Sequence, residues 1–388
     1  MKKKAILFFG ICILIVFSLV TILSGCKTTT AETAAETTAA AETTAAAETT
    51  AAAETTAAET TAADTKWVHG IADIITTHPF HRVWLDVQPR DIDPVYNVET
   101  IFKDANALID QQISDIDSFL TSKPDVLTIV AVDGVAIQPS AQKALDAGLP
   151  VQAFGVQIDV PGVVNLLLPD YETFEIYAHL LAAYLNFEGN ICYLSGIKGN
   201  SSSDGRENGF LDAIKAYPGI KVLDVQPSDW DIDKGLGIVE GWLNKYDDID
   251  AMVMVDNQIA LPAIETIKSF GKDDILVTGY SGDENGLKGV GDGSLLFDAI
   301  ISPELFGWSA TQMAYLMLNG VDVPMMSKVS GPIVMTQETL DKINANGIKN
   351  LDLGSLNWLT PDVALNYAKD VLPKVYGKEE TDKQYNLN

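Results

Sequence analysis

Short apolar runs alternate with helical stripes along most of the chain. The clearest pair is the run Ala251–Val255 followed by an amphipathic stripe over Ile259–Ile267. A short, continuously apolar run is typical of a strand buried on both faces of a parallel sheet, and the stripe predicts a helix. Asp256 and Asn257 stand between them, at the end of the strand where open α/β sheets bind ligands. Both residues are therefore candidate ligand contacts, with capping of the helix as the alternative.

The same alternation recurs along the chain. Ten runs predict strands: Val68–Ile75, Val98–Phe102, Val126–Val132, Val151–Phe154, Val163–Leu168, Ile191–Leu194, Ile220–Val225, Ala251–Val255, Ile275–Gly279 and Leu296–Ile301. Further helices are predicted over Ile109–Leu120, Tyr171–Phe187, Asp204–Tyr217, Asp231–Tyr246 and Pro303–Asn319. Strands that alternate with helices predict parallel sheets with right-handed crossovers. Two sheets of about five strands each fit better than one very wide sheet.

The first helix has an irregular pattern. It would begin near His78-Pro79-Phe80, but Pro89 and Pro94 follow within the same stretch. Proline removes a backbone donor and its ring clashes with the preceding turn of a helix. We therefore expect a short or broken helix at this place.

Residues 1–25 have the pattern of a bacterial lipoprotein signal peptide. Three lysines precede the apolar run Ala5–Leu23, and Leu23-Ser-Gly-Cys26 resembles a lipobox. The resemblance implies cleavage before Cys26 and a lipid on its thiol. We therefore expect an extracytoplasmic protein held at the cell membrane, with an uncleaved signal anchor as the alternative.

Residues 26–65 contain the lipidated cysteine and a linker of repeated Ala, Thr and Glu. Such a composition cannot form a core, and a flexible coil of this length would span roughly 35 Å. The net charge of −27 argues against a nucleic-acid partner. Beyond the linker only Cys192 remains, so a disulfide framework is excluded and a buried apolar role is expected.

A set of motifs follows in order along the rest of the chain. They are Gln112-Ile-Ser-Asp-Ile, Ala144-Leu-Asp-Ala-Gly-Leu-Pro-Val151, Asp204-Gly-Arg206-Glu-Asn-Gly-Phe210, Gln226-Pro-Ser-Asp-Trp230, Val255-Asp-Asn-Gln-Ile-Ala-Leu261 and Val277-Thr-Gly-Tyr-Ser-Gly282. From Trp67 to about Gly331 the chain resembles the ribose-binding-type periplasmic proteins, the sugar receptors of ATP-binding-cassette (ABC) importers. The resemblance implies an α/β type I periplasmic-binding-protein fold, with two doubly wound parallel-sheet lobes joined by three hinge crossings.

The resemblance also divides the chain into lobes. It implies a first lobe over residues 66–169 with about 302–331, and a second lobe over 170–301 with about 332–388. It further implies a monomer that captures a sugar or polyol and delivers it to the permease subunits of an ABC importer. A sensory receptor coupled to a histidine kinase or chemoreceptor shares this fold and stays the alternative.

The resemblance assigns ligand contacts position by position. An arginine fork suits adjacent sugar oxygens, and a flat aromatic ring suits the C–H face of a sugar. The ligand-binding residues expected are His78, Phe80, Arg206, Trp230, Asp256, Asn257, Ser281 and Asp283. The alternatives are an ion pair between Arg206 and Glu207, and core positions for Trp230 and Phe80.

Three positions depart from the ribose receptors. Gly155-Val156 replaces a ligand-facing Asp-Arg pair, Ser281 replaces an aspartate, and Ile301 replaces the hinge glutamine. Each ribose hydroxyl left unpaired would cost about 1–3 kcal/mol. We therefore expect a deoxy sugar, a less oxygenated polyol or a bulkier ligand in place of ribose. Substitute polar groups would come from Gln152, Gln157 and Asp159.

Other chemistry has little support in the sequence. The acidic run Asp229–Glu240 mimics a calcium loop, but Lys234 stands where such a loop needs glycine, and a helix start explains the same acids. No nucleophile, base and orienting acid occur at a recognisable spacing. We therefore expect no catalytic residues, no metal and no cofactor, and a binding protein in place of an enzyme.

Overall fold

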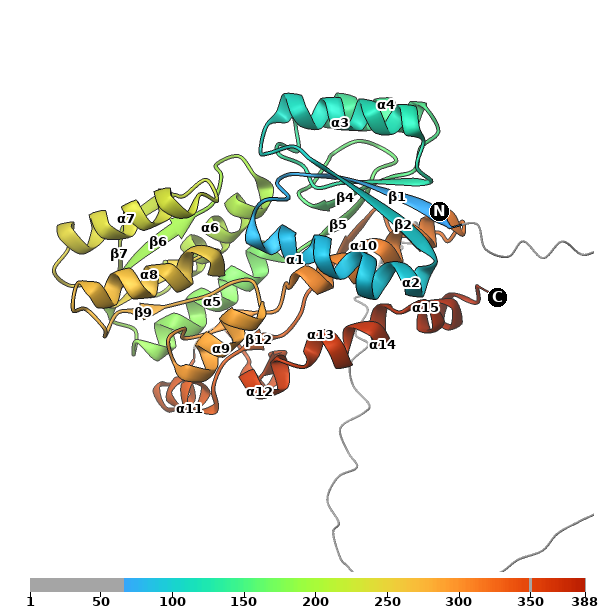
Figure 1. The fold of residues 1–388 in the computed structure, drawn as a ribbon. Coiled ribbons are helices and arrows are strands. Elements are labelled where there is room, and N and C mark those ends of the chain that lie inside the picture. The colour runs from blue at the N-terminus through green and yellow to red at the C-terminus, as the bar shows by residue number, and fades with distance from the viewer. Residues whose placement is uncertain (1–65, 349–350, 388) are drawn as a thin grey trace, which may run out of the picture. The chain divides into compact units, whose positions relative to one another are not determined.

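The computed structural model describes residues 66–348 and 351–387. The expected signal peptide, the lipidated Cys26 and the linker lie outside the described residues. No helix in the described part of the chain is both long and apolar enough to span a bilayer. Strands and helices alternate along the chain, and the expected α/β fold with parallel sheets is confirmed (Figure 1).

Six parallel strands form the sheet of the first lobe, in the order β2-β1-β3-β4-β5-β11. They are β1 (Trp67–Asp73), β2 (Val98–Asp104), β3 (Val126–Ile129), β4 (Val151–Gly155), β5 (Val164–Leu167) and β11 (Met326–Lys328). The helices on its two faces are α3 (Ile109–Ser122) and α4 (Gln138–Asp146) on one, and α1 (Pro79–Val87) and α10 (Pro303–Leu318) on the other. The strand order reverses beside β1, which creates the kind of switch point where open sheets bind ligands.

The side chains of β1 show how both faces are covered. Ile71 packs in the core with α1 and α10, whereas Ala72 packs in the core under α3 and α4. Both residues are fully buried, because successive strand side chains point to opposite faces. A strand covered on both faces is largely apolar, and the buried polar residue His69 within β1 has a partner, because its Nε2 lies 2.6 Å from Thr128 Oγ1.

Four parallel strands form the sheet of the second lobe, in the order β7-β6-β8-β9. Its elements are α5 (Asp170–Tyr184), β6 (Gly189–Ser195), α6 (Ser201–Ile214), β7 (Ile220–Pro227), α7 (Ile232–Lys245), β8 (Ala251–Met254), α8 (Asn257–Ser269), β9 (Leu276–Val277) and α9 (Glu284–Asp292). On β8, Ala251 and Val253 share a core with α5 and α6, whereas Met252 and Met254 share one with α7 and α8.

Cys192 lies on β6 as a free thiol that is completely buried in the core beneath α7 and α8. Burial raises the pKa of this thiol to about 12, because the apolar surroundings disfavour the thiolate. The predicted buried, apolar role of Cys192 is therefore confirmed.

The chain passes between the two sheets at three places. The three crossings follow β5, β10 (Asp298–Ala299) and β11. The crossing after β11 leads to β12 (Ile333–Val334). The strand expected over 296–301 is short and pairs antiparallel with β12 in a separate three-stranded sheet, so the expectation of two five-stranded sheets is wrong. The buried carboxylate of Asp298 explains the difference, because it accepts from the backbone N–H groups of Ser281 and Gly282 where a longer strand would pair.

The first helix is broken, as predicted. After α1 the chain forms one π-helical turn (Gln88–Ile92) that contains Pro89, and then the short α2 (Asp93–Tyr96). The buried Gln88 side chain holds this junction, since it accepts from Trp84 Nε1 at 2.9 Å and donates to Asp93 at 2.8 Å.

The end of the chain differs from our expectation. We expected all of 332–388 on the second lobe, where α11 (Gln337–Asn346), β13 (Trp358–Leu359) and α12 (Pro361–Ala364) do lie. The chain then continues through α13 (Tyr367–Asp370) to α14 (Leu372–Tyr376) and α15 (Lys378–Tyr385), which pack on the first lobe (Figure 1). We call residues 351–387 the C-terminal strap. The last helix, α15, is almost entirely polar, so no apolar stripe in the sequence predicted that the chain returns to the first lobe.

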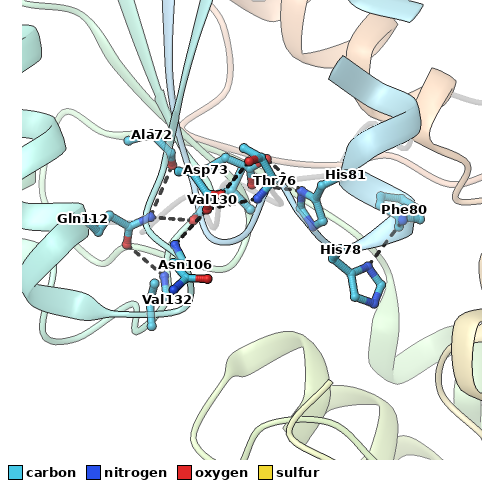
Figure 2. A network of polar contacts seen from close by, with 11 residues as sticks. Ala72, Asp73, Thr76, His78, Phe80, His81, Asn106, Gln112, Val130 and Val132 are labelled. Carbon is cyan, nitrogen blue, oxygen red and sulfur yellow. Dashed lines mark hydrogen bonds and ion pairs between the residues drawn. The ribbon is translucent and has the colours of Figure 1, made fainter. Parts of the chain in front are cut away.

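Gln112 closes the first sheet at its carboxyl edge. Its Nε2 donates to the carbonyls of Ala72 and Val130 at 3.2 and 2.8 Å, and its Oε1 accepts from the N–H of Val132 at 2.9 Å (Figure 2). β3 has ended here, so the Val130 carbonyl and the Val132 N–H have left the ladder and need other partners, whereas the Ala72 carbonyl also accepts from the Val130 N–H at 3.0 Å. One buried side chain on α3 thus fixes the ends of two adjacent strands.

Replacing this side chain tests its role. The substitution Gln112→Ala would leave the Val130 carbonyl and the Val132 N–H without this partner, at about 1–3 kcal/mol for a buried group without a partner. We expect urea unfolding to show a clear loss of stability of this size or more. Gln142→Ala is the matched control, because Gln142 is exposed on α4 and bonds only to Asp146. Equal stability of the two variants would contradict the role given to Gln112.

Candidate ligand-binding site

The carboxyl edges of the two sheets meet at His78 and Asp256. His78 Nε2 lies 3.2 Å from Asp256 Oδ2, and the two side chains are only 10% and 9% exposed. The other ring nitrogen of His78 accepts from the N–H of Phe80 and caps α1, while Asp256 Oδ1 accepts from the N–H of Gln258 and caps α8. Each residue thus caps a helix with one atom and faces the opposite lobe with another.

Polar contacts hold the loop that carries His78 (Figure 2). The fully buried carboxylate of Asp73, at the end of β1, contacts His81 Nδ1 at 2.9 and 3.0 Å. Thr76 donates to Asp104 through both its N–H and its hydroxyl, at 3.1 and 2.6 Å. Burial disfavours the Asp104 carboxylate, but these hydrogen bonds outweigh it and lower the pKa of Asp104. The loop is therefore fixed on both sides of His78.

Arg206 is buried and largely engaged inside the second lobe. Its Nε donates to Asp170 Oδ1 at 2.8 Å, and its Nη1 donates to the carbonyl of Val255 at 2.9 Å. The guanidinium lies 4.3 Å from the centre of the Tyr280 ring, and the Tyr280 hydroxyl donates to Asp170 at 3.1 Å. Burial would lower the pKa of Arg206, but Asp170 and Tyr280 raise it, so the side chain stays charged. The bonds to Asp170 and Val255 use two of the five guanidinium N–H groups, which leaves three for other partners.

Trp230 lies beside Arg206 on a strained turn. Asp229 and Trp230 both have left-handed backbones, with φ of 58° and 60°, which is costly for residues other than glycine. Ser228 anchors the turn by donating twice to the last carbonyl of β6. The turn places the half-buried indole 5.3 Å from the Arg206 guanidinium and so close to Gly196 that a Cβ there would lie 2.3 Å from the ring. Backbone strain of this kind is typical of functional sites.

Ser281 supplies an unused polar group. Its side chain is 1% exposed and its Oγ has no hydrogen-bond partner, although its N–H donates to Asp298 at 2.9 Å. A buried hydroxyl without a partner costs free energy, and a ligand oxygen would remove that cost. Ser281 is therefore suited to a ligand contact.

Asn257 and Asp283 have structural roles instead of the expected ligand contacts. Asn257 is fully buried, accepts from the N–H of Tyr280, and donates to Asp298 at 2.8 Å and Asp283 at 3.3 Å. Asp283 also caps α9 by accepting from two of its N–H groups. Burial and the nearby Asp283 raise the pKa of Asp298 to about 7. These groups tie α8 and α9 to the turn after β9 and leave no free amide for a ligand.

Phe80 belongs to an aromatic cluster beneath the site. It is buried and packs edge-on against Phe306 at 4.9 Å, and Phe306 contacts both Phe154 and Trp84. The cluster gives the first lobe an apolar floor next to His78. The alternative of a core position for Phe80 is thus supported, and its edge can still form a wall of the site.

The lobes contact each other directly at the first departure from the ribose receptors. The Gly155 carbonyl accepts from Ser202 Oγ at 2.9 Å, and the Gln157 N–H donates to Ser201 Oγ at 3.2 Å. Gln152, considered as a substitute polar group, is buried inside the first lobe and donates to Thr128 and to the Ala310 carbonyl. Gln152 is therefore unable to reach a ligand.

Sequence reasoning missed Asp170 and Tyr280. Asp170 follows Pro169 at the first crossing and begins α5, so it reads as an ordinary acid in a first helical turn. The expected alternative, an Arg206–Glu207 pair, is wrong, because Glu207 pairs with Lys198 at 2.5 Å. A buried arginine needs a buried acid, and that requirement was the only signal for Asp170.

The calcium-like run is a helix start. Asp231 caps α7 by accepting from the N–H of Lys234, and Asp229 forms an ion pair with the Lys234 side chain. Among the described residues, no group of three or more His, Cys, Asp or Glu side chains is placed to hold a metal ion.

Known proteins resemble most of the described chain. The sequence model of the family described as "Periplasmic binding protein domain" matches residues 93–322. The xylitol-binding protein of Mycolicibacterium smegmatis is 25% identical over 64% of this chain and 70% of its own length. The ribose import binding protein RbsB of Bacillus subtilis is 30% identical over 61% of this chain and 76% of its own length.

A solved structure agrees with these matches. It is an ABC transporter periplasmic solute-binding protein from Actinobacillus succinogenes 130z with bound D-allose. It superposes with a TM-score of 0.66 at 19% identity, and 71% of this chain covers all of that protein. At this identity the similarity establishes the fold.

The position of Arg206 can be tested through Asp170. The substitution Asp170→Asn leaves the buried guanidinium without its charged partner, and breaking a buried pair in this way typically costs about 3–5 kcal/mol. We expect a large fall in the urea midpoint and altered fluorescence of the neighbouring Trp230. The control Asp212→Asn removes an exposed acid paired with Lys215 on α6 and should change the midpoint little. A small effect of Asp170→Asn would contradict the positioning role.

Proposed function

Because the chain belongs to the periplasmic binding protein domain family, we propose that it is a membrane-anchored solute-binding protein. It captures a sugar or polyol between its two lobes and delivers the ligand to the permease subunits of an ABC importer. The RbsB relative, named as an import protein, supports the transport role. The lipobox-like residues before Cys26 support a lipid anchor on the outer side of the cell membrane.

One observation carries the proposal: polar and aromatic groups converge from both lobes at the carboxyl edges of the two sheets. His78 comes from the first lobe, and Arg206, Trp230, Asp256 and Ser281 come from the second. Asp256 can accept from a hydroxyl, Arg206 can donate to one, and the indole can cover a C–H face. Since Ser281 Oγ has no partner within the protein, a ligand hydroxyl is its natural partner.

The changed positions narrow the ligand class. At Gly155 the first lobe bonds to Ser202 of the second lobe, and at Ile301 a buried apolar side chain replaces a polar one. A site with fewer hydrogen-bonding groups suits a polyol or a deoxy sugar better than ribose, because every unpaired hydroxyl costs free energy. The relative named as a xylitol-binding protein is consistent with a polyol.

Binding is coupled to closure of the lobes. Contacts such as His78–Asp256 and Ser202–Gly155 exist only when the carboxyl edges of the sheets are close together. A ligand that touches both lobes favours this closed form by its higher affinity for it. The permease then recognises the closed protein. The sensory alternative uses the same closure of the lobes. It differs only in the partner that recognises the closed protein, which would be a histidine kinase or a chemoreceptor.

A ligand panel tests the assignment. Thermal unfolding of residues 27–388 is measured with pentoses, hexoses, deoxy sugars and polyols. A ligand at about one hundred times its dissociation constant stabilises by about 2.7 kcal/mol, which is a readily resolved shift in Tm. We expect a shift with polyols or deoxy sugars and a smaller one with ribose. A flat response across the panel, from protein that unfolds cooperatively, would overturn the sugar assignment.

Single substitutions then locate the site. We expect Asp256→Ala and Ser281→Ala each to weaken binding of the selected ligand by about tenfold, as for the loss of one buried hydrogen bond to a ligand. Isothermal titration calorimetry measures the change. Glu265→Ala is the control, since Glu265 lies exposed on α8 and pairs only with Lys268. Unchanged affinity in both site variants would move the ligand elsewhere.

A further inference from the structure

The C-terminal strap lies beyond the residues that the family model matches. That model ends at Asp322, well before the strap begins. The strap starts on the second lobe after α11 and ends in α15 beside the first lobe (Figure 1). It therefore makes a fourth connection between the lobes, in addition to the three crossings.

The first half of the strap is fixed to the second lobe. β13 pairs with β12, and the backbone of Ile333 and Met335 donates to the carbonyls of Asn357 and Leu359 at 2.9 and 3.2 Å. Farther along, Ala364 is buried in the same core cluster as α7 and α8. This half must move together with the second lobe.

The second half is fixed to the first lobe by buried and half-buried contacts. Leu372 is completely buried, and Gln312 Nε2 on α10 donates to Thr381 Oγ1 at 2.8 Å. The Tyr96 hydroxyl donates to the Tyr376 carbonyl and lies 3.2 Å from the fully buried Thr381 Oγ1. Such contacts cost more to break than those of a frayed terminus. This half must move together with the first lobe.

A short segment joins the two halves. Only residues 365–371 separate the buried Ala364 from the buried Leu372. Within this segment Tyr367 is partly buried and packs on two core clusters, one beneath α7 and α8 in the second lobe and one that contains residues of both lobes. A rotation of one lobe against the other must therefore deform this segment or release α14 and α15.

We propose that the strap restrains opening of the two lobes. In the closed arrangement both ends are docked without loss of contacts, whereas a wide rotation loses either the Tyr367 packing or the hydrogen bonds of Thr381. The ligand-free protein is thus held near the closed arrangement, with a narrower range of lobe rotation than three crossings alone would allow. Ligand exchange then requires a limited opening that leaves α15 in place.

The test measures the distance between the lobes in the full-length chain, purified in detergent and free of ligand. Spin labels are attached to p-acetylphenylalanine introduced at the exposed Ser118 of α3 and Glu240 of α7. The double variant Thr381→Val, Tyr315→Phe removes the bonds that hold α15, including the 2.7 Å bond from Tyr315 to Asp382. A second variant ends at Asn366 and lacks α13, α14 and α15. Neither variant alters the ligand-facing residues.

We expect both variants to gain a population at long distance that is at least about fivefold larger than in the unmodified chain, because the loss of one ordinary hydrogen bond would already give that factor and each variant loses more than one. The control Lys383→Gln breaks only the exposed 3.5 Å pair with Glu380 on α15 and should keep the original distribution. An unchanged distribution in the double variant would overturn the proposal, even where the shortened chain fails to fold. The measurement uses no sugar, so its outcome is independent of the proposed ligand.

Discussion

The buried pair of Arg206 and Asp170 is the contact on which the site depends. Asp170 opens α5 at the first crossing, and its carboxylate binds both the guanidinium and the Tyr280 hydroxyl. A charge buried this deeply is tolerated only with a partner. The pair fixes the guanidinium against the carboxyl end of β8 and supports the indole of Trp230. The crossing between the lobes and the polar wall of the site are therefore built from the same carboxylate.

Much of the fold could be predicted from the sequence, for a simple reason. The strand β8, for example, is covered on both faces, so its apolar run is continuous and stands out between helical stripes. The break in the first helix was predictable from Pro89, because proline interrupts helical hydrogen bonding. The prediction of strands fails where a side chain replaces strand pairing. At β10 the Asp298 carboxylate accepts from the backbone N–H groups of Ser281 and Gly282, and no local sequence pattern predicts this contact.

The candidate site was predicted only in part. The helix-capping positions Asp256 and His78 do face each other, because the ends of parallel strands meet at one edge of each sheet. Asn257 stands next to Asp256 in the sequence but points into the lobe, where Tyr280 and Asp298 use its amide. Sequence alone does not distinguish the two, since adjacent residues at a helix start point in different directions.

The position of Tyr96 has a mechanical consequence. The indole of Trp67, at the start of β1, donates to the Tyr96 carbonyl at 3.0 Å, and the Tyr96 hydroxyl binds the Tyr376 carbonyl near the other end of the chain. Both ends of the described chain are therefore fastened to the first lobe. A pull that enters through the residues before Trp67 is borne by this lobe alone. The second lobe lies outside this load path, so such a pull does not act on its rotation, which the crossings and the C-terminal strap govern.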